Sequence, residues 1–249
     1  MALPFIKIDW VVTLLLLLVS CNSNARSPIP DNTQKFGKVV IDYSDTNSVA
    51  YRQMIYSLDT FYQRQVSKGF NGSVLIGYKG KILYERYFGF SQKESGAPWS
   101  PETQSQLAST SKTLTSGAVL LLKDKGLLNL DDLVSTYIPS FPYNDITIRM
   151  LLNHRSGLPD YIHFAPKPSG KLYLNNDDIV DLFASKKPKL KFVPNTKFNY
   201  SNSNFAMLAS VVENVSGMKF DYFMKRFIFT QKKKKNTFVI DPNKERVCT

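Results

Sequence analysis

The sequence predicts an α+β fold, in which an antiparallel sheet is flanked by helices and followed by a helical subdomain. Two β-rich runs flank Lys79-Gly80, which predicts a β-hairpin over residues 72–90. Apolar side chains recur at helical spacing on both sides of this hairpin, over residues 48–67 and 109–125. Residues 130–229 carry mostly short helical patterns and loops. Because two strands alone are marginally stable in water, we expect the hairpin to belong to a larger sheet.

The two long predicted helices each have one apolar face. In residues 48–67 this face comprises Met54, Ile55, Leu58, Phe61, Tyr62 and Val66, and Gly69 follows the helix. A polar loop over residues 91–101 leads from the hairpin to the second helix. The buried stripe of that helix is expected to consist of Leu114, Ala118, Leu121 and Leu122, and Gly126 fits the position after its end.

Shorter elements are predicted in the second half of the chain. Helices are expected near residues 131–137, 147–153, 177–185, 203–215 and 219–229. The 203–215 helix is followed by Gly217, and its apolar face comprises Phe205, Leu208, Ala209, Val212 and Val215. Residues 236–241 form a short β-like run.

The first residues have the pattern of a secretion signal. Residues 11–19 are almost wholly apolar, but this run is too short for a comfortable membrane span and fits the core of a signal peptide. Leu18-Val19-Ser20-Cys21 resembles the bacterial lipobox, in which the cysteine is acylated. We therefore expect a signal peptide over 1–20, a lipidated Cys21, a flexible tether over 21–45 and a folded domain over 46–249. An uncleaved anchor helix is the alternative, and both place the domain outside the cytoplasm, in the bacterial cell envelope.

Charge and cysteine content narrow the function classes. Thirty-two Lys and Arg against 20 Asp and Glu give a net charge of +12, which suits anionic surroundings such as nucleic acid, lipid head groups or wall polymers. Export argues against nucleic acid, and the charge equally fits a solvated surface. Two Cys cannot form a disulfide framework, and two His and two Cys far apart do not make a zinc site. We expect no metal, no cofactor and a monomer.

Ser109 and Lys112 carry the first chemical signal, at the predicted start of a helix. They are three residues apart, so both side chains lie on one face. A serine hydroxyl is a weak nucleophile that needs a nearby base, and a helix N-terminus favours a developing oxyanion. Taken alone, the pair also fits an N-capping serine beside a solvated lysine.

Tyr200 and Asn202 carry the second signal, in a turn before an amphipathic helix. A phenol near Lys112 would act as a proton relay, and Asn202 would hold the lysine and a substrate amide. Taken alone, these residues also fit a core tyrosine and an N-cap asparagine.

His154 lies in the third notable segment, residues 151–161, and suggests a triad with Ser109. A structural histidine is favoured, because Lys112 and Tyr200 already fill the role of the base. Ser156 in the same segment has no nucleophile-elbow sequence around it.

Together these motifs resemble the serine β-lactamase and penicillin-binding-protein superfamily, and within it the class C β-lactamase-like branch. The resemblance covers about two-thirds of the chain, through the hairpin, the Ser109 motif and residues 121–132, 151–161 and 194–202. It implies a β-lactamase/transpeptidase-like fold and an acyl-enzyme mechanism. It also implies that Ser109 is the nucleophile, that Lys112 and Tyr200 transfer protons, and that Asn202 is a positioning residue.

The sequence departs from this family at its C-terminal end. The third family motif, Lys or His followed by Ser or Thr and Gly, does not occur after Tyr200. The C-terminal strands of the family's sheet are also missing, so the chain is interpreted as truncated. Since loss of one oxyanion donor costs about 10²–10³ in rate, we expect the chain to be poorly active or inactive on its own.

The predicted function is that of a cell-envelope serine hydrolase acting on β-lactams, D-amino-acid peptides or small esters. Its expected partners are a small-molecule or peptidoglycan-type substrate and a membrane reached through the lipid anchor. One alternative is a catalytically impaired pseudoenzyme or wall-binding lipoprotein. Another is a basic envelope-surface module that binds anionic polymers, and neither role requires turnover.

Overall fold

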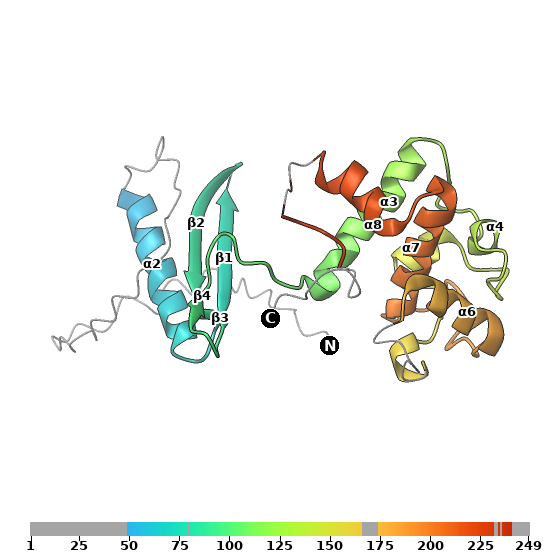
Figure 1. Cartoon of the computed structure of the whole chain (residues 1–249), viewed down its shortest axis with the longest axis horizontal. Helices are drawn as coiled ribbons and strands as arrows, with labels where there is room; N and C mark the ends of the chain where they lie inside the picture. The colour runs from blue at the N-terminus through green and yellow to red at the C-terminus, as the bar shows by residue number, and fades with distance from the viewer. Residues whose placement is uncertain (1–48, 79, 166–173, 232–233, 235, 241–249) are drawn as a thin grey trace, which may run out of the picture. The chain divides into compact units, whose positions relative to one another are not determined.

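The computed structural model describes residues 49–78, 80–165, 174–231, 234 and 236–240 (Figure 1). The predicted signal peptide, Cys21 and the tether lie outside the described residues. The chain divides into two compact units, with the boundary between Phe88 and Gly89.

The first unit contains the helix and the hairpin that the sequence predicts. Helix α2 (Val49–Val66) precedes strands β1 (Gly72–Tyr78) and β2 (Lys81–Phe88), as Figure 1 shows. The strands pair antiparallel from Gly72↔Phe88 to Tyr78↔Lys81, with a bulge between Ile76 and Gly77. Within the described residues this sheet has two strands, and the larger sheet expected around the hairpin is not formed there.

Aromatic side chains join α2 to β2. The ring of Tyr62 stacks on those of Tyr84 and Phe88, with centroids 5.7 and 5.9 Å away. Such pairs add a stabilisation of about 0.5–1.5 kcal/mol beyond the burial of their area. An ion pair between Arg86 and Asp59 links the same two elements. On the predicted apolar face of α2, Ile55, Leu58, Tyr62 and Val66 are partly buried, whereas Met54 and Phe61 are exposed.

The second unit is mainly helical. It begins with a short ladder between β3 (Phe90–Gln92) and β4 (Ala97–Pro98), inside the segment that was expected to be a loop. Short or irregular helices follow: η2 (Ala108–Thr110), α4 (Val134–Tyr137), α5 (Ile148–Leu152), η3 (Tyr161–His163), α8 (Phe220–Phe223) and η4 (Met224–Phe229). The longer helices are α3 (Ser111–Asp124), α6 (Asn176–Lys186) and α7 (Asn202–Ser216).

Helix α7 is the centre of the second unit. It packs against α3 and α6 (Figure 1), and its side chains Met207, Leu208, Val211 and Val212 are fully buried. Gly217 ends the helix with a φ of +67°, a conformation that glycine adopts without strain. Leu208, Ala209 and Val212 of the predicted stripe are buried, whereas Phe205 and Val215 are only partly buried and pack against the core.

The buried face of α3 differs slightly from the predicted stripe. Ala118 and Leu122 are buried as expected, and Val119 is buried with them. Leu114 and Leu121 pack against this core but remain partly exposed. The stripe is shifted because α3 faces α7 and η4.

Two elements near the C-terminal end differ from the prediction. The helix expected over 219–229 is divided into α8 and the π-helix η4, where Thr230 N–H bonds the carbonyl of Lys225 five residues earlier. Residues 236–240 form no strand, and Asp241 lies outside the described residues. The predicted β-like run is therefore wrong for the described part.

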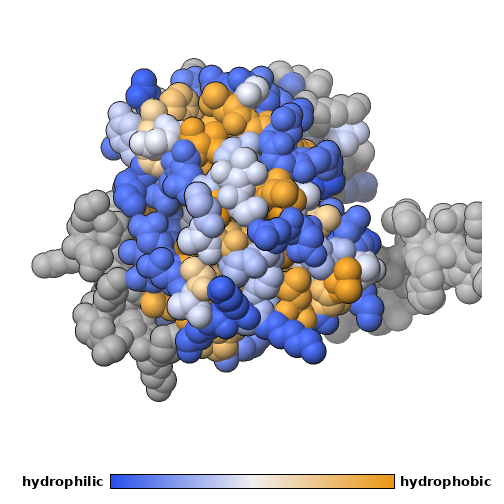
Figure 2. Space-filling model, turned by 90° about the vertical axis from the view of Figure 1, so that its right-hand side faces the viewer, coloured by the Kyte–Doolittle hydropathy of each residue, from blue (hydrophilic) through white to orange (hydrophobic). Residues whose placement is uncertain are grey.

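The surface of the molecule is mostly polar on the face shown in Figure 2, with hydrophobic residues gathered in smaller groups between hydrophilic ones. Such a surface fits the interpretation that much of the positive charge is solvated. Among the described residues, none of the helices has the length and apolar character that a membrane span requires.

Candidate active site

Ser109 and Lys112 lie at the junction of η2 and α3. Ser111 ends the 3₁₀ turn and begins the α-helix, so the backbone stays helical between the two side chains. Lys112 Nζ donates a hydrogen bond of 3.1 Å to Ser109 Oγ. Ala108, immediately before Ser109, has a φ of +47°, which is uncommon for a residue with a side chain. The spacing predicted from the sequence thus produces a direct contact.

Tyr200 and Asn202 flank Ser201, the residue before α7, and contact Ser109 and Lys112. Tyr200 Oη lies 2.7 Å from Ser109 Oγ, and Lys112 Nζ donates to Asn202 Oδ1 at 2.8 Å. Ser201 is the N-cap residue of α7, so the helix start places the side chains on either side of it. The structure therefore brings together all four residues that the sequence singled out in the folded domain.

Lys112 affects the pKa of the Tyr200 phenol. The nearby ammonium of Lys112 is the largest cause that lowers the pKa of Tyr200, and the hydrogen bond with Ser109 acts in the same direction. Desolvation and the charge of Asp160 oppose this shift. Lys112 Nζ also lies 5.0 Å from the centroid of the Tyr200 ring, within cation–π range. A lowered pKa increases the fraction of phenolate, which is the form of Tyr200 that can accept a proton.

His154 supports the turn that carries Tyr200. Its Nδ1 accepts a hydrogen bond of 3.3 Å from Ser201 N–H and lies 2.9 Å from Asn204 Nδ2. Since a backbone N–H can only donate, Nδ1 is unprotonated and the neutral ring carries its proton on Nε2. Burial first, and then the charge of Lys112, lower the pKa of His154, which favours this neutral form.

The triad suggested for His154 is not seen within the described residues. The ring of His154 packs 4.6 Å from that of Tyr200, measured between centroids, and its Nδ1 is engaged by the start of α7. Tyr200, rather than His154, is the hydrogen-bond partner of Ser109. The structural interpretation of this histidine fits these contacts.

Asp160 is a site residue that the sequence analysis missed. It is only 7% exposed, and its Oδ2 accepts hydrogen bonds from both Asn202 Nδ2 (2.8 Å) and Asn202 N (3.1 Å). Its Oδ1 accepts from the N–H of Ile162, which caps η3. The available signal was an aspartate before a short helix in residues 151–161, which is typical of an N-cap. That signal does not reveal the contact with Asn202.

The loop that carries Asp160 is held by close backbone packing. Gly157 has a φ of +79°, and a Cβ at this position would lie 2.4 Å from the carbonyl oxygen of Phe192. Gly157 O accepts a hydrogen bond from Lys191 N. Ser156 is buried, donates to Asn204 Oδ1 and accepts from Leu158 N–H, so this hydroxyl has a structural role. Only glycine fits position 157 without displacing the backbone at Phe192.

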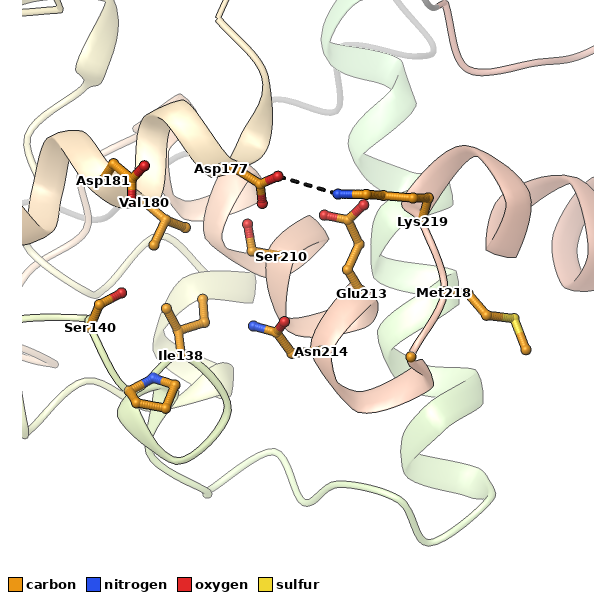
Figure 3. Close-up of a pocket in the computed structure, with 12 residues that line it drawn as sticks. Ile138, Ser140, Asp177, Val180, Asp181, Ser210, Glu213, Asn214, Met218 and Lys219 are labelled. Carbon is orange, nitrogen blue, oxygen red and sulfur yellow. Dashed lines mark hydrogen bonds and ion pairs between the residues drawn. The ribbon is translucent and has the colours of Figure 1, made fainter.

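A separate hollow of about 560 Å³ lies between α4, α6 and the end of α7 (Figure 3). None of the four site residues lines it. Lys219 Nζ and Asp177 Oδ2, 3.2 Å apart, form an ion pair at this hollow, and Glu213 points toward it. Burial raises the pKa of Glu213, while its hydrogen bond from Phe220 N–H opposes the shift. Among the described residues, no group of acidic, His or Cys side chains is arranged to hold a metal ion.

Serine acylation is the chemistry that this arrangement can perform. Ser109 Oγ has two neighbours able to take part in proton transfer, the phenol of Tyr200 and the amine of Lys112. Ser109 also lies in the first turn of a helical segment, where the helix dipole is positive. Such a turn stabilises negative charge near the serine.

Comparisons with known proteins agree with this chemistry. A family model described as Beta-lactamase matches residues 59–247. The chain is 41% identical over 162 residues to Penicillin-binding protein 4* of Bacillus subtilis (strain 168). The matched residues make up 64% of this chain and 36% of that protein. The chain spans little more than a third of the length of the curated relatives that it matches.

Two solved structures share the fold. FmtA from Staphylococcus aureus has a TM-score of 0.65 and 28% identity, covering 80% of this chain and 51% of that one. EstCE1, described as a hydrolase with promiscuous acyltransferase activity, has a TM-score of 0.65 and 25% identity, covering 74% of this chain and 52% of that one.

Proposed function

We propose that this chain, which belongs to the beta-lactamase family, is a cell-envelope serine hydrolase that works through an acyl-enzyme on Ser109. The observation that carries the proposal is the 2.7 Å contact between Ser109 Oγ and Tyr200 Oη, with Lys112 bonded to the same serine oxygen. The proposed substrates are β-lactams, D-amino-acid peptides or small esters.

The proposed reaction begins with transfer of the Ser109 hydroxyl proton to the phenolate oxygen of Tyr200. The lowered pKa of Tyr200, which increases the phenolate fraction, supports its role as the base. Ser109 Oγ then attacks the carbonyl carbon of the substrate, and the positive end of the helix dipole stabilises the oxyanion that forms. The C–N or C–O bond to the leaving group breaks, and the leaving amine or alcohol takes the proton from Tyr200.

Hydrolysis completes the proposed cycle. A water molecule gives a proton to Tyr200 and attacks the acyl carbon, and the bond from that carbon to Ser109 Oγ breaks. The proton returns to Ser109, which regenerates the free hydroxyl. Lys112 stays beside Ser109 through its hydrogen bond of 2.8 Å to Asn202 Oδ1.

Names of similar proteins support the proposed substrate classes. One relative is called a penicillin-binding protein, and one structural neighbour is described as a hydrolase with acyltransferase activity. The lipid anchor at Cys21 and the envelope location belong to the same proposal, which the signal-like N-terminal sequence supports. Reaction of the purified chain with a labelled penicillin or a fluorophosphonate, read by intact mass, tests the proposal, with Ser109→Ala as control.

A binding role without turnover is the second candidate. It is favoured by the net charge of +12, which suits anionic wall polymers. A folded chain that binds wall fragments but forms no adduct at Ser109 would support this candidate over the hydrolase.

A further inference from the structure

Asp160 is a buried carboxylate that the proposed acyl-transfer scheme does not use. Asp160 is the N-cap residue of η3, and its two side-chain oxygens accept hydrogen bonds from different segments. Oδ1 accepts from Ile162 N–H at 3.2 Å and caps η3. Oδ2 faces the start of α7, where it accepts two hydrogen bonds from Asn202. The two hydrogen bonds from Asn202 connect this aspartate to the candidate site.

The contacts of Asn202 fix which end of its side-chain amide faces which neighbour. A carboxylate can only accept hydrogen bonds, so the NH₂ end of the amide must face Asp160. A lysine ammonium can only donate, so the carbonyl end must face Lys112. The amide is therefore held in one orientation from both sides.

We propose that Asp160 is a positioning residue, which fixes the Asn202 amide so that its carbonyl oxygen holds Lys112 beside Ser109. This inference rests on the proposed function for its consequence in acylation. Within the described part of the chain, Lys112 is hydrogen-bonded to Asn202 and Ser109 and forms no ion pair. The negative charge of Asp160 thus acts on the lysine through an amide. Without Asp160, a half-turn of the amide would present NH₂ to the ammonium, and Lys112 would move away from Ser109.

The first test needs no turnover. In the full chain, the side-chain amide signal of Asn202 is assigned by NMR through its loss in Asn202→Ala. We expect this signal to be shifted and protected from solvent exchange by its bond to a buried carboxylate. Asp160→Ala should remove the protection and Asp160→Asn should weaken it. Ser203→Ala is the matched control, because it cuts another bond between the same segments, from Tyr161 N–H to Ser203 Oγ, and it should leave the signal unchanged.

The second test measures the consequence for acylation. The rate of Ser109 labelling by a fluorophosphonate is compared in wild type, Asp160→Asn, Asn202→Ala and the double variant. We expect each single variant to label about 10-fold more slowly, as for loss of a hydrogen bond to a charged group. If Asp160 acts through Asn202, adding Asp160→Asn to Asn202→Ala should change the rate by no more than about twofold.

The outcomes separate the inference from the proposed function. If wild type is folded but takes no label, the proposed function fails, and the amide signal alone decides whether Asp160 orients Asn202. An unchanged amide signal in Asp160→Ala would overturn the inference. So would wild-type labelling in Asp160→Asn, or fully additive effects in the double variant. A purely structural capping role would lower thermal stability but give additive rates.

Discussion

Ser109 Oγ lies 2.7 Å from Tyr200 Oη, although 91 residues separate the two positions in the chain. The contact forms because the start of α7 packs against the start of α3, and buried side chains of both helices meet in one core. Ser109 lies in η2, directly before α3, and Tyr200 lies directly before the N-cap residue of α7. The packing of α3 on α7 therefore brings the nucleophile and its base together.

Loss of the Tyr200 hydroxyl should slow acylation strongly. In Tyr200→Phe the ring stays but Ser109 loses its proton acceptor, so labelling of Ser109 should fall about 10²–10⁴-fold. Stopped incubations with a fluorophosphonate, read by intact mass, measure this rate. Tyr222→Phe is the control, because Tyr222 is exposed on α8. Equal rates in Tyr200→Phe and wild type would remove Tyr200 from the mechanism.

Lys112 should control the ionisation of Tyr200. Its closeness to Tyr200 is the largest cause that lowers the pKa of this phenol, so Lys112→Met should raise that pKa. Phenolate absorbance during a pH titration measures the change. The titration curve of the same protein with Tyr200→Phe is subtracted, so that only the absorbance of Tyr200 remains. Lys123→Met should have no effect, because Lys123 pairs with Asp124 instead. A Tyr200 pKa that stays the same in Lys112→Met would contradict the geometry.

Part of this site could be predicted from the sequence. The Ser109 and Lys112 contact is local, since three residues along a helix separate neighbours on one face. The start of α7 at Asn202 was also predicted to within a residue, because its apolar face and the following Gly217 are strong local signals. The resemblance to a family then linked Tyr200 and Asn202 to the serine.

Other features depend on contacts that no local pattern encodes. Asp160 bonds Asn202 across 42 residues, and a single sequence shows only that an aspartate precedes a short helix. The backbone of Phe192 lies against Gly157 through loop packing, which has no periodic signal. The β-like pattern near residue 236 was misleading, because a strand needs a neighbouring strand and the described residues offer none there.

Gly157 should be far more sensitive to substitution than a glycine in open space. Gly157→Ala adds a Cβ that would lie 2.4 Å from a backbone oxygen, whereas the Cβ of Gly126→Ala would meet nothing within 4 Å. Both positions have a positive φ, so both variants carry the same strain of about 1–2 kcal/mol. The clash should cost Gly157→Ala about 1–3 kcal/mol more in the free energy of unfolding. Urea denaturation measures this difference, and equal losses would show that the loop adjusts freely.

His154 should make stability depend on pH. Its pKa in the folded chain lies below the usual 6.5, so the unfolded chain binds more protons in mildly acidic solution. The free energy of unfolding should therefore decrease as the pH falls below about 6.5, and this contribution should be fully present above it. Urea denaturation at several pH values measures the effect, and the difference between wild type and His154→Asn isolates it from carboxylates such as Glu213. An identical pH dependence in the two proteins would mean that His154 titrates normally.

Covalent labelling of Ser109 is the most direct test of the proposed acyl-enzyme. The purified chain is incubated with a labelled penicillin and with a fluorophosphonate, and the intact mass is measured beside Ser109→Ala and Ser111→Ala. We expect one adduct per chain that is lost in Ser109→Ala and kept in Ser111→Ala, since the Ser111 hydroxyl bonds the carbonyl of Ala108 rather than the site. A folded chain that forms no adduct, or an adduct that persists in Ser109→Ala, would contradict the proposal.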